Sequence, residues 1–198
     1  MNPISKSDEE LLQRFVDRFE ELSGLRFYPA TDPIAREFRT GEIDGTRIEE
    51  KWRPVRVATA PSALDGLRAK LPARIPTLFE HLLLNYRWAD VDLDIFTLTA
   101  NPIGNDLSRW LAEAARDEFL WNFHLRSGYI PFGKGPDMDY DRICFETRTR
   151  KRGDECRIVK IDHEEALCSE RITIVRELAP SFRSLVEQTI AHKKSSMA

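Results

Sequence analysis

Three carboxylates alternate along one short segment of the chain, at Asp137, Asp139 and Asp141. The spacing imitates the start of an EF-hand calcium loop, in which alternate side chains bind the ion. Such a loop also needs glycine at its sixth position and glutamate at its twelfth, and these positions hold Arg142 and Arg148. We therefore interpret the segment as a solvated acidic rim on a sheet edge. A looser site for a hard cation, built from oxygen ligands, is the alternative.

The run Asp162-His163-Glu164-Glu165 could also do chemistry, because a histidine beside carboxylates can act as an acid–base pair. However, no serine or cysteine stands in a recognisable nucleophile motif, and the other histidines are scattered along the chain. We therefore interpret the run as a strand end followed by a helix, whose N-terminus favours glutamates. The alternative function is a metal-assisted hydrolase or a small-molecule binder that uses Asp137, Asp139, Asp141, Asp162 and His163.

The spacing of a phosphate-binding loop, G-x-x-x-x-G-K, spans Gly128 to Lys134. Such a loop lies between a strand and a helix, and serine or threonine follows its lysine, whereas Gly135 stands at that position here. The intervening residues Tyr129-Ile130-Pro131-Phe132 are themselves typical of a strand, and the acidic segment that follows would repel phosphates. The sequence therefore predicts a strand and not a nucleotide site.

The overall composition indicates a soluble globular protein, since 41% of the 198 residues are hydrophobic and 32% are charged. The net charge of -3 argues against direct binding to nucleic acid or to an anionic membrane. No apolar run reaches the roughly 20 residues that span a membrane, and the N-terminus lacks the apolar segment of a signal peptide. Three cysteines without close pairs predict reduced thiols and no zinc site. We expect a cytoplasmic protein that uses no cofactor.

Hydrophobic periodicity predicts helices at both ends of the chain and strands mainly in its last third. The expected helices cover residues 7–22, 62–71, 75–86, 106–118 and 180–190. Ser7 is the expected N-cap of the first helix, and the helix from residue 106 runs on into the aromatic patch 119–124 and stops at Ser127-Gly128. The expected strands cover residues 93–99, 129–133, 142–147, 157–162 and 171–177. Strands joined by short turns predict an α+β fold with one mainly antiparallel sheet, flanked by N- and C-terminal helices. We divide the chain into an N-terminal helical arm or extension (1–60), an α+β domain (61–192) and a frayed tail (193–198).

Several short motifs occur in a defined order along the α+β domain. The first is Leu71-Pro72 before a helix that ends in Leu83-Leu84-Asn85-Tyr86-Arg87-Trp88. The later ones are Gly128-Tyr129-Ile130-Pro131-Phe132-Gly133, Asp139-Tyr140-Asp141, Ile161-Asp162-His163-Glu164 and Leu178-Ala179-Pro180-Ser181-Phe182. This order resembles the SUKH superfamily, which includes Smi/Knr-type cell-wall assembly regulators and bacterial toxin-immunity proteins. The resemblance implies an α+β domain that is not an enzyme and that masks a toxin, often a nuclease or a deaminase, by tight contact.

An acidic surface with aromatic residues agrees with such a role, because it can cover the basic active site of a nuclease. Exposed aromatic anchors would supply much of the affinity. We therefore predict a protein-binding surface made of Trp88, Tyr129, Phe132, Asp137, Asp139, Tyr140, Asp141, Asp162 and Glu164. The expected function is an immunity or regulatory role through protein binding, without chemistry of its own.

Overall fold

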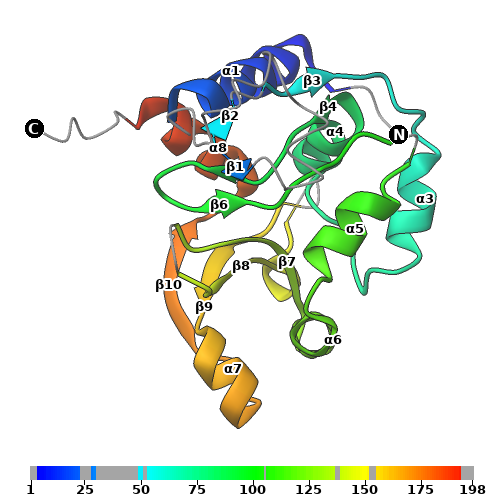
Figure 1. The fold of residues 1–198 in the computed structure, drawn as a ribbon. Helices are drawn as coiled ribbons and strands as arrows, with labels where there is room; N and C mark the ends of the chain where they lie inside the picture. The colour runs from blue at the N-terminus through cyan, green and yellow to red at the C-terminus, as the bar shows by residue number, and fades with distance from the viewer. Residues whose placement is uncertain are drawn as a thin grey trace, which may run out of the picture.

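A six-stranded antiparallel sheet forms the centre of the protein (Figure 1). The computed structural model describes residues 4–22, 28–29, 49–50, 53–104, 106–136, 139–151 and 155–192. The strands of the sheet, in spatial order, are β10 (Ile174–Ala179), β9 (Ile158–Ile161), β8 (Arg142–Glu146), β7 (Tyr129–Lys134), β6 (Thr97–Leu98) and β5 (Val91–Asp92). Neighbours in the sequence are thus neighbours in the sheet, as short connections favour. The predicted α+β class with one mainly antiparallel sheet is confirmed.

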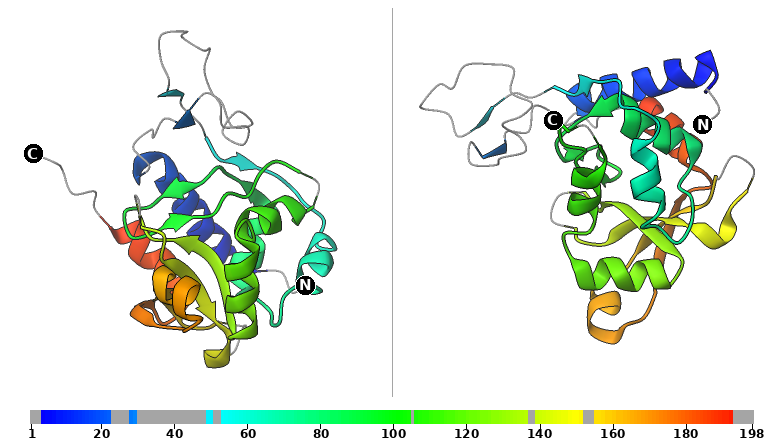
Figure 2. Two further views of the ribbon diagram at one scale, coloured as in Figure 1. Left: turned by 60° about the horizontal axis from the view of Figure 1, so that its bottom comes forward. Right: turned by 90° about the vertical axis from the view of Figure 1, so that its right-hand side faces the viewer.

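The helices lie around this sheet (Figure 2). The described helices are α1 (Lys6–Leu22), α3 (Ala63–Arg68), α4 (Thr77–Asn85), α5 (Ser108–Ala114), α6 (Glu118–Arg126), α7 (His163–Ser169) and α8 (Phe182–Ala191), with a short 3-10 helix, η1, at Thr147–Thr149. Two further pairs of short antiparallel strands are present. Strand β1 (Tyr28–Pro29) pairs with β2 (Glu49–Glu50), and β3 (Val55–Arg56) pairs with β4 (Tyr86–Arg87). The N- and C-terminal helices α1 and α8 lie side by side, and α6 packs beside β7 (Figures 1 and 2).

Helix α1 belongs to the main hydrophobic core. Its side chains Leu12, Phe15, Val16 and Phe19 are buried there together with residues of α4 and α8. Their spacing of three and four residues places them on one face of the helix, as the sequence predicts. The division of the chain at residue 60 stays a prediction.

An aromatic cluster fills the core between the helices and the sheet. The rings of Phe132 on β7 and Phe145 on β8 stack with centroids 4.1 Å apart. Phe79 on α4 contacts Phe145 and, on α8, Phe182, with centroids 5.1 Å apart in both pairs. The rings of Phe79 and Trp110 form a T-shaped pair with centroids 5.8 Å apart. Phe79 of α4 therefore contacts side chains of α5, α8 and the sheet.

The strand predicted over residues 93–99 is instead a tight hairpin. Strands β5 and β6 pair with Val91 opposite Leu98 and Asp92 opposite Thr97. The turn between them places Asp94 at a φ of 63°, in the left-handed region that aspartate tolerates better than most residues. The Asp92 carboxylate accepts the Asp94 backbone N–H at 2.9 Å, which holds the turn. Alternating apolar residues continue through this turn, and for that reason the sequence pattern did not reveal it.

Two helix boundaries also differ from the prediction. Helix α1 starts after Ser5, whose hydroxyl accepts the Asp8 backbone N–H at 3.2 Å, so that Ser7 is not the cap. The helix predicted to begin near residue 106 is split into α5 and α6, because Asp117 caps a new helix by accepting the Leu120 N–H at 3.0 Å. A capping side chain inside an apolar-periodic segment thus divides it.

We predict that Phe79→Ala lowers the free energy of unfolding by about 3 to 5 kcal/mol, because it leaves a cavity among the packed rings. The matched control is Phe119→Ala, since Phe119 is 45% exposed, and we expect a change below about 0.5 kcal/mol for it. Urea denaturation followed by circular dichroism measures both values. Equal, small losses for the two variants would contradict the central position of Phe79.

Candidate functional site

The three aromatic anchors Trp88, Tyr129 and Phe132 are buried, with exposed fractions of 0%, 6% and 0%. The Trp88 indole N–H donates to the Thr99 carbonyl at 2.9 Å, and Phe132 stacks on Phe145 within the aromatic cluster. The Tyr129 hydroxyl donates to Glu146 at 3.2 Å, and burial, together with this carboxylate, raises the pKa of Tyr129. The prediction that these side chains form a docking surface is therefore wrong. They stabilise the core because large aromatic rings remove the most apolar area from water.

The acidic segment before β8 is folded back onto Lys160 of β9. The Lys160 ammonium lies 2.5 Å from an Asp139 carboxylate oxygen and 3.1 Å from one of Asp141. The other Asp141 oxygen accepts the His163 backbone N–H at 2.8 Å. A side chain at Gly135 would collide with Asp139, whose Cγ lies 2.1 Å from the Cβ position, so glycine allows the segment to close. Asp137, the first of the predicted carboxylates, lies outside the described residues.

The carboxylates at the start of α7 are also engaged. Asp162 caps the helix, since its side chain accepts the Glu165 N–H at 2.9 Å. Glu165 pairs with Arg171 at 2.6 Å. Glu164 points to solvent as an exposed residue. Of the predicted acidic residues, Asp162 therefore has a structural role, and Glu164 is the one on α7 that is accessible.

Exposed apolar side chains occur on the same elements as these carboxylates and at the start of β10. Tyr140 is 55% exposed, and its ring lies 6.0 Å from the His163 ring at the start of α7. Leu167, one turn further along α7, is 45% exposed. The Asp162 N–H donates to the Thr173 carbonyl at 3.0 Å, which places the exposed start of β10 beside α7. We call the following residues the sheet-end surface: Tyr140, His163, Glu164, Leu167, Ile174 and Val175.

Several of the side chains that could carry out catalysis are buried. Cys144 and Cys156 are buried, and burial raises the pKa of the Cys144 thiol, which makes it a poor nucleophile. His124 is buried as well; burial lowers its pKa, and its Nδ1 contacts the Leu120 carbonyl at 2.6 Å. Within the described ranges, no three His, Cys, Asp or Glu side chains are grouped so that they could hold a metal ion.

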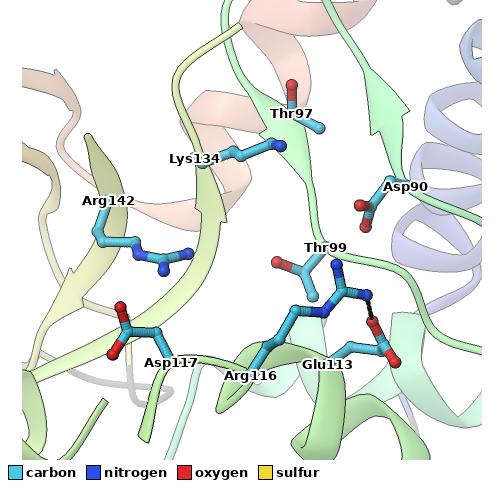
Figure 3. Close-up of a pocket in the computed structure, with 8 residues that line it drawn as sticks. All are labelled: Asp90, Thr97, Thr99, Glu113, Arg116, Asp117, Lys134 and Arg142. Carbon is cyan, nitrogen blue, oxygen red and sulfur yellow. Dashed lines mark hydrogen bonds and ion pairs between the residues drawn. The ribbon is translucent and has the colours of Figure 1, made fainter. Parts of the chain in front are cut away.

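A polar cavity on the sheet was missed in the sequence analysis. It measures about 160 Å³ and lies next to β6, β7 and β8, where α5 is followed by α6 (Figure 3). It is lined by Asp90, Thr97, Thr99, Glu113, Arg116, Asp117, Lys134 and Arg142. The only signal in the sequence was that charged residues follow the apolar part of β7 and precede that of β8. That pattern does not predict that the end of β7 and the start of β8 lie side by side.

Comparison of the chain with protein-family models, with curated proteins and with solved structures found no match. None of the helices in the described part of the chain is long and apolar enough to cross a membrane. The site must therefore be judged from its own geometry.

We predict that Lys160→Met lowers the free energy of unfolding by about 1 kcal/mol at neutral pH, because it leaves two carboxylates without their cation. Burial raises the pKa of Asp139, but hydrogen bonds from Lys160 and the Asp141 amide outweigh it and hold this pKa below its ordinary value of 3.8. A lowered pKa stabilises the fold above the ordinary value, and this stabilisation is lost as the pH falls through the folded-state pKa. The difference between wild type and variant should therefore close below about pH 4.

Denaturation at a series of pH values measures this difference. Lys70→Met is the control, since Lys70 is exposed, and it should track the wild type throughout. A difference for Lys160→Met that persists undiminished at pH 2 to 3, where carboxylates are protonated, would contradict the ion-pair explanation.

Proposed function

We propose that this chain is a protein-binding domain without catalytic activity, with an immunity or regulatory role in the cytoplasm, and that it masks a toxin or enzyme partner. The observation that carries the proposal is the sheet-end surface, where exposed apolar side chains lie among carboxylates. Four of its side chains are large and apolar with exposed fractions of at least 38%: Tyr140, Leu167, Ile174 and Val175. Aromatic and aliphatic anchors of this kind dominate the binding energy of protein interfaces.

The charge around this surface favours a basic partner. Six carboxylates stand in the segment before β8 and along α7, at Asp139, Asp141, Asp162, Glu164, Glu165 and Glu170. Four cations lie on or beside the same elements, at Arg142, Lys160, Arg171 and Arg176. Complementary charge speeds the encounter of two proteins and excludes wrong partners. An acidic excess suits the basic active site of a nuclease toxin, the partner class that the SUKH resemblance implies.

The individual carboxylates contribute unequally. Asp139 and Asp141 already bind Lys160, and Glu165 already pairs with Arg171. Glu164 and Glu170 are exposed, and Glu170 ends α7 in the left-handed conformation that turns the chain toward β10. These two glutamates are therefore the residues that we expect to meet a basic partner.

We predict that Tyr140→Ala and Leu167→Ala each weaken binding to the partner at least tenfold, which corresponds to about 1.4 kcal/mol. The partners to test are the proteins that the neighbouring genes encode, and surface plasmon resonance measures association and dissociation. Val55→Ala is the control, because Val55 is 38% exposed on β3, which lies at the opposite end of the molecule from α7 (Figure 1). Its affinity should equal that of the wild type.

Glu164→Lys combined with Glu170→Lys should act mainly on the association rate, because steering by charge changes encounter more than dissociation. The salt dependence of that rate should fall in the same variant. If the alanine variants and the charge-reversal variant all bind as tightly as the wild type, the sheet-end surface is not the binding surface. If the wild type binds none of the proteins that the neighbouring genes encode, the proposed partner class is wrong.

A further inference from the structure

Two cations face each other across β7 and β8 at the wall of the polar cavity. Lys134 and Arg142 are directly opposite in the strand register, and Thr97 of β6 is opposite Lys134. Residues paired in this way point to the same face of the sheet, with Cβ atoms about 5 Å apart. Like charges in such positions destabilise the sheet unless an anion lies between or beside them.

Each carboxylate of the cavity has another partner. Asp90 accepts the Ala100 backbone N–H at 2.7 Å, and Asp117 accepts the Leu120 N–H at 3.0 Å as the cap of α6. Glu113 is paired with Arg116 (Figure 3). Among the described residues, no carboxylate lies at ion-pairing distance from Lys134 or Arg142, although the Asp117 side chain faces Arg142 across the cavity (Figure 3).

A hydroxyl group adds a neutral donor at the same place. Thr99 is half-buried and its side chain projects into the space between Lys134, Asp90 and Arg116 (Figure 3). Thr97 is less available, because its hydroxyl donates to the Gly135 carbonyl at 3.3 Å. Both cations are themselves half-buried. Charge-assisted hydrogen bonds from lysine, arginine and a hydroxyl are the usual means by which a protein holds a carboxylate or a phosphoryl group.

We propose that the cavity binds a small oxyanion, a carboxylate or a phosphoryl group, between Lys134 and Arg142 with the Thr99 hydroxyl as a further donor. The size of the cavity, about 160 Å³, suits a ligand of a few heavy atoms. It is smaller than the roughly 300 Å³ or more of pockets that hold drug-sized molecules. This site uses none of the residues of the sheet-end surface, so it goes beyond the proposed protein binding and can fail independently of it.

Calorimetric titration tests the proposal with inorganic phosphate and, separately, with succinate, at an ionic strength held constant with sodium chloride. We expect dissociation constants of roughly 1 mM, since such a site makes only a few contacts. Lys134→Gln and Arg142→Gln should each weaken binding at least tenfold. Lys6→Gln removes the same charge from a side chain that is 90% exposed on α1, and it should leave binding unchanged. Binding of phosphate alone identifies a phosphoryl site, and binding of succinate alone identifies a carboxylate site.

Thermal unfolding separates ligand binding from a structural role of the lysine. In buffer without either anion, Lys134→Gln should be as stable as the wild type or more stable, because the repulsion from Arg142 is relieved. Phosphate or succinate should raise the melting temperature of the wild type and not that of the variant. Absence of binding by both anions overturns the proposal. Equal binding by the wild type and both glutamine variants, or a marked loss of stability in anion-free Lys134→Gln, overturns it as well.

Discussion

The register between β7 and β8 determines which of their side chains point into the aromatic core and which point into the polar cavity. Side chains alternate across a strand, so a shift by one residue would exchange the core face with the cavity face. In the observed register, with an irregularity between Pro131 and Gly133, Phe132 and Phe145 stack in the core, and Lys134 meets Arg142 at the cavity. Gly133 also permits β6 to approach, because a Cβ there would lie 2.5 Å from the Thr97 carbonyl oxygen.

The described end of the connection between the same two strands, at residues 139–141, is held in place by ion pairs and hydrogen bonds. Lys160 reaches from β9 to Asp139 and Asp141, and Asp141 in turn accepts the His163 N–H of α7. Tyr140 stands between these two engaged carboxylates with its ring exposed. A ring presented from a fixed backbone loses less conformational entropy on binding than one on a free loop. The acidic residues therefore position the aromatic side chain as much as they provide charge.

The sheet-end surface and the polar cavity have opposite electrostatic character. Around α7 the exposed carboxylates include Glu164 and Glu170. In the cavity, the cations Lys134 and Arg142 have no carboxylate at ion-pairing distance among the residues that the structure describes. A basic protein partner and a small anion would thus be directed to different places on the molecule. The two proposals rest on separate residues, and each can stand without the other.

The sequence by itself determined the α+β class, the four long strands of the sheet and most helices, because periods of two and of 3.6 residues are local properties of the chain. It also indicated Tyr140 and Glu164, which are exposed. Only the tertiary structure decided that Trp88, Tyr129 and Phe132 are buried, since residue type does not show which face of a strand another element covers.

The ion pairs and the polar cavity depend on contacts between residues far apart in the sequence. The partner of Asp139 is Lys160, which lies 21 residues away, and the cavity assembles side chains from Asp90 to Arg142 across strands and helices. Charge pairing of this kind depends on distances in space, and these are fixed by strand register and helix packing, which no short sequence pattern encodes.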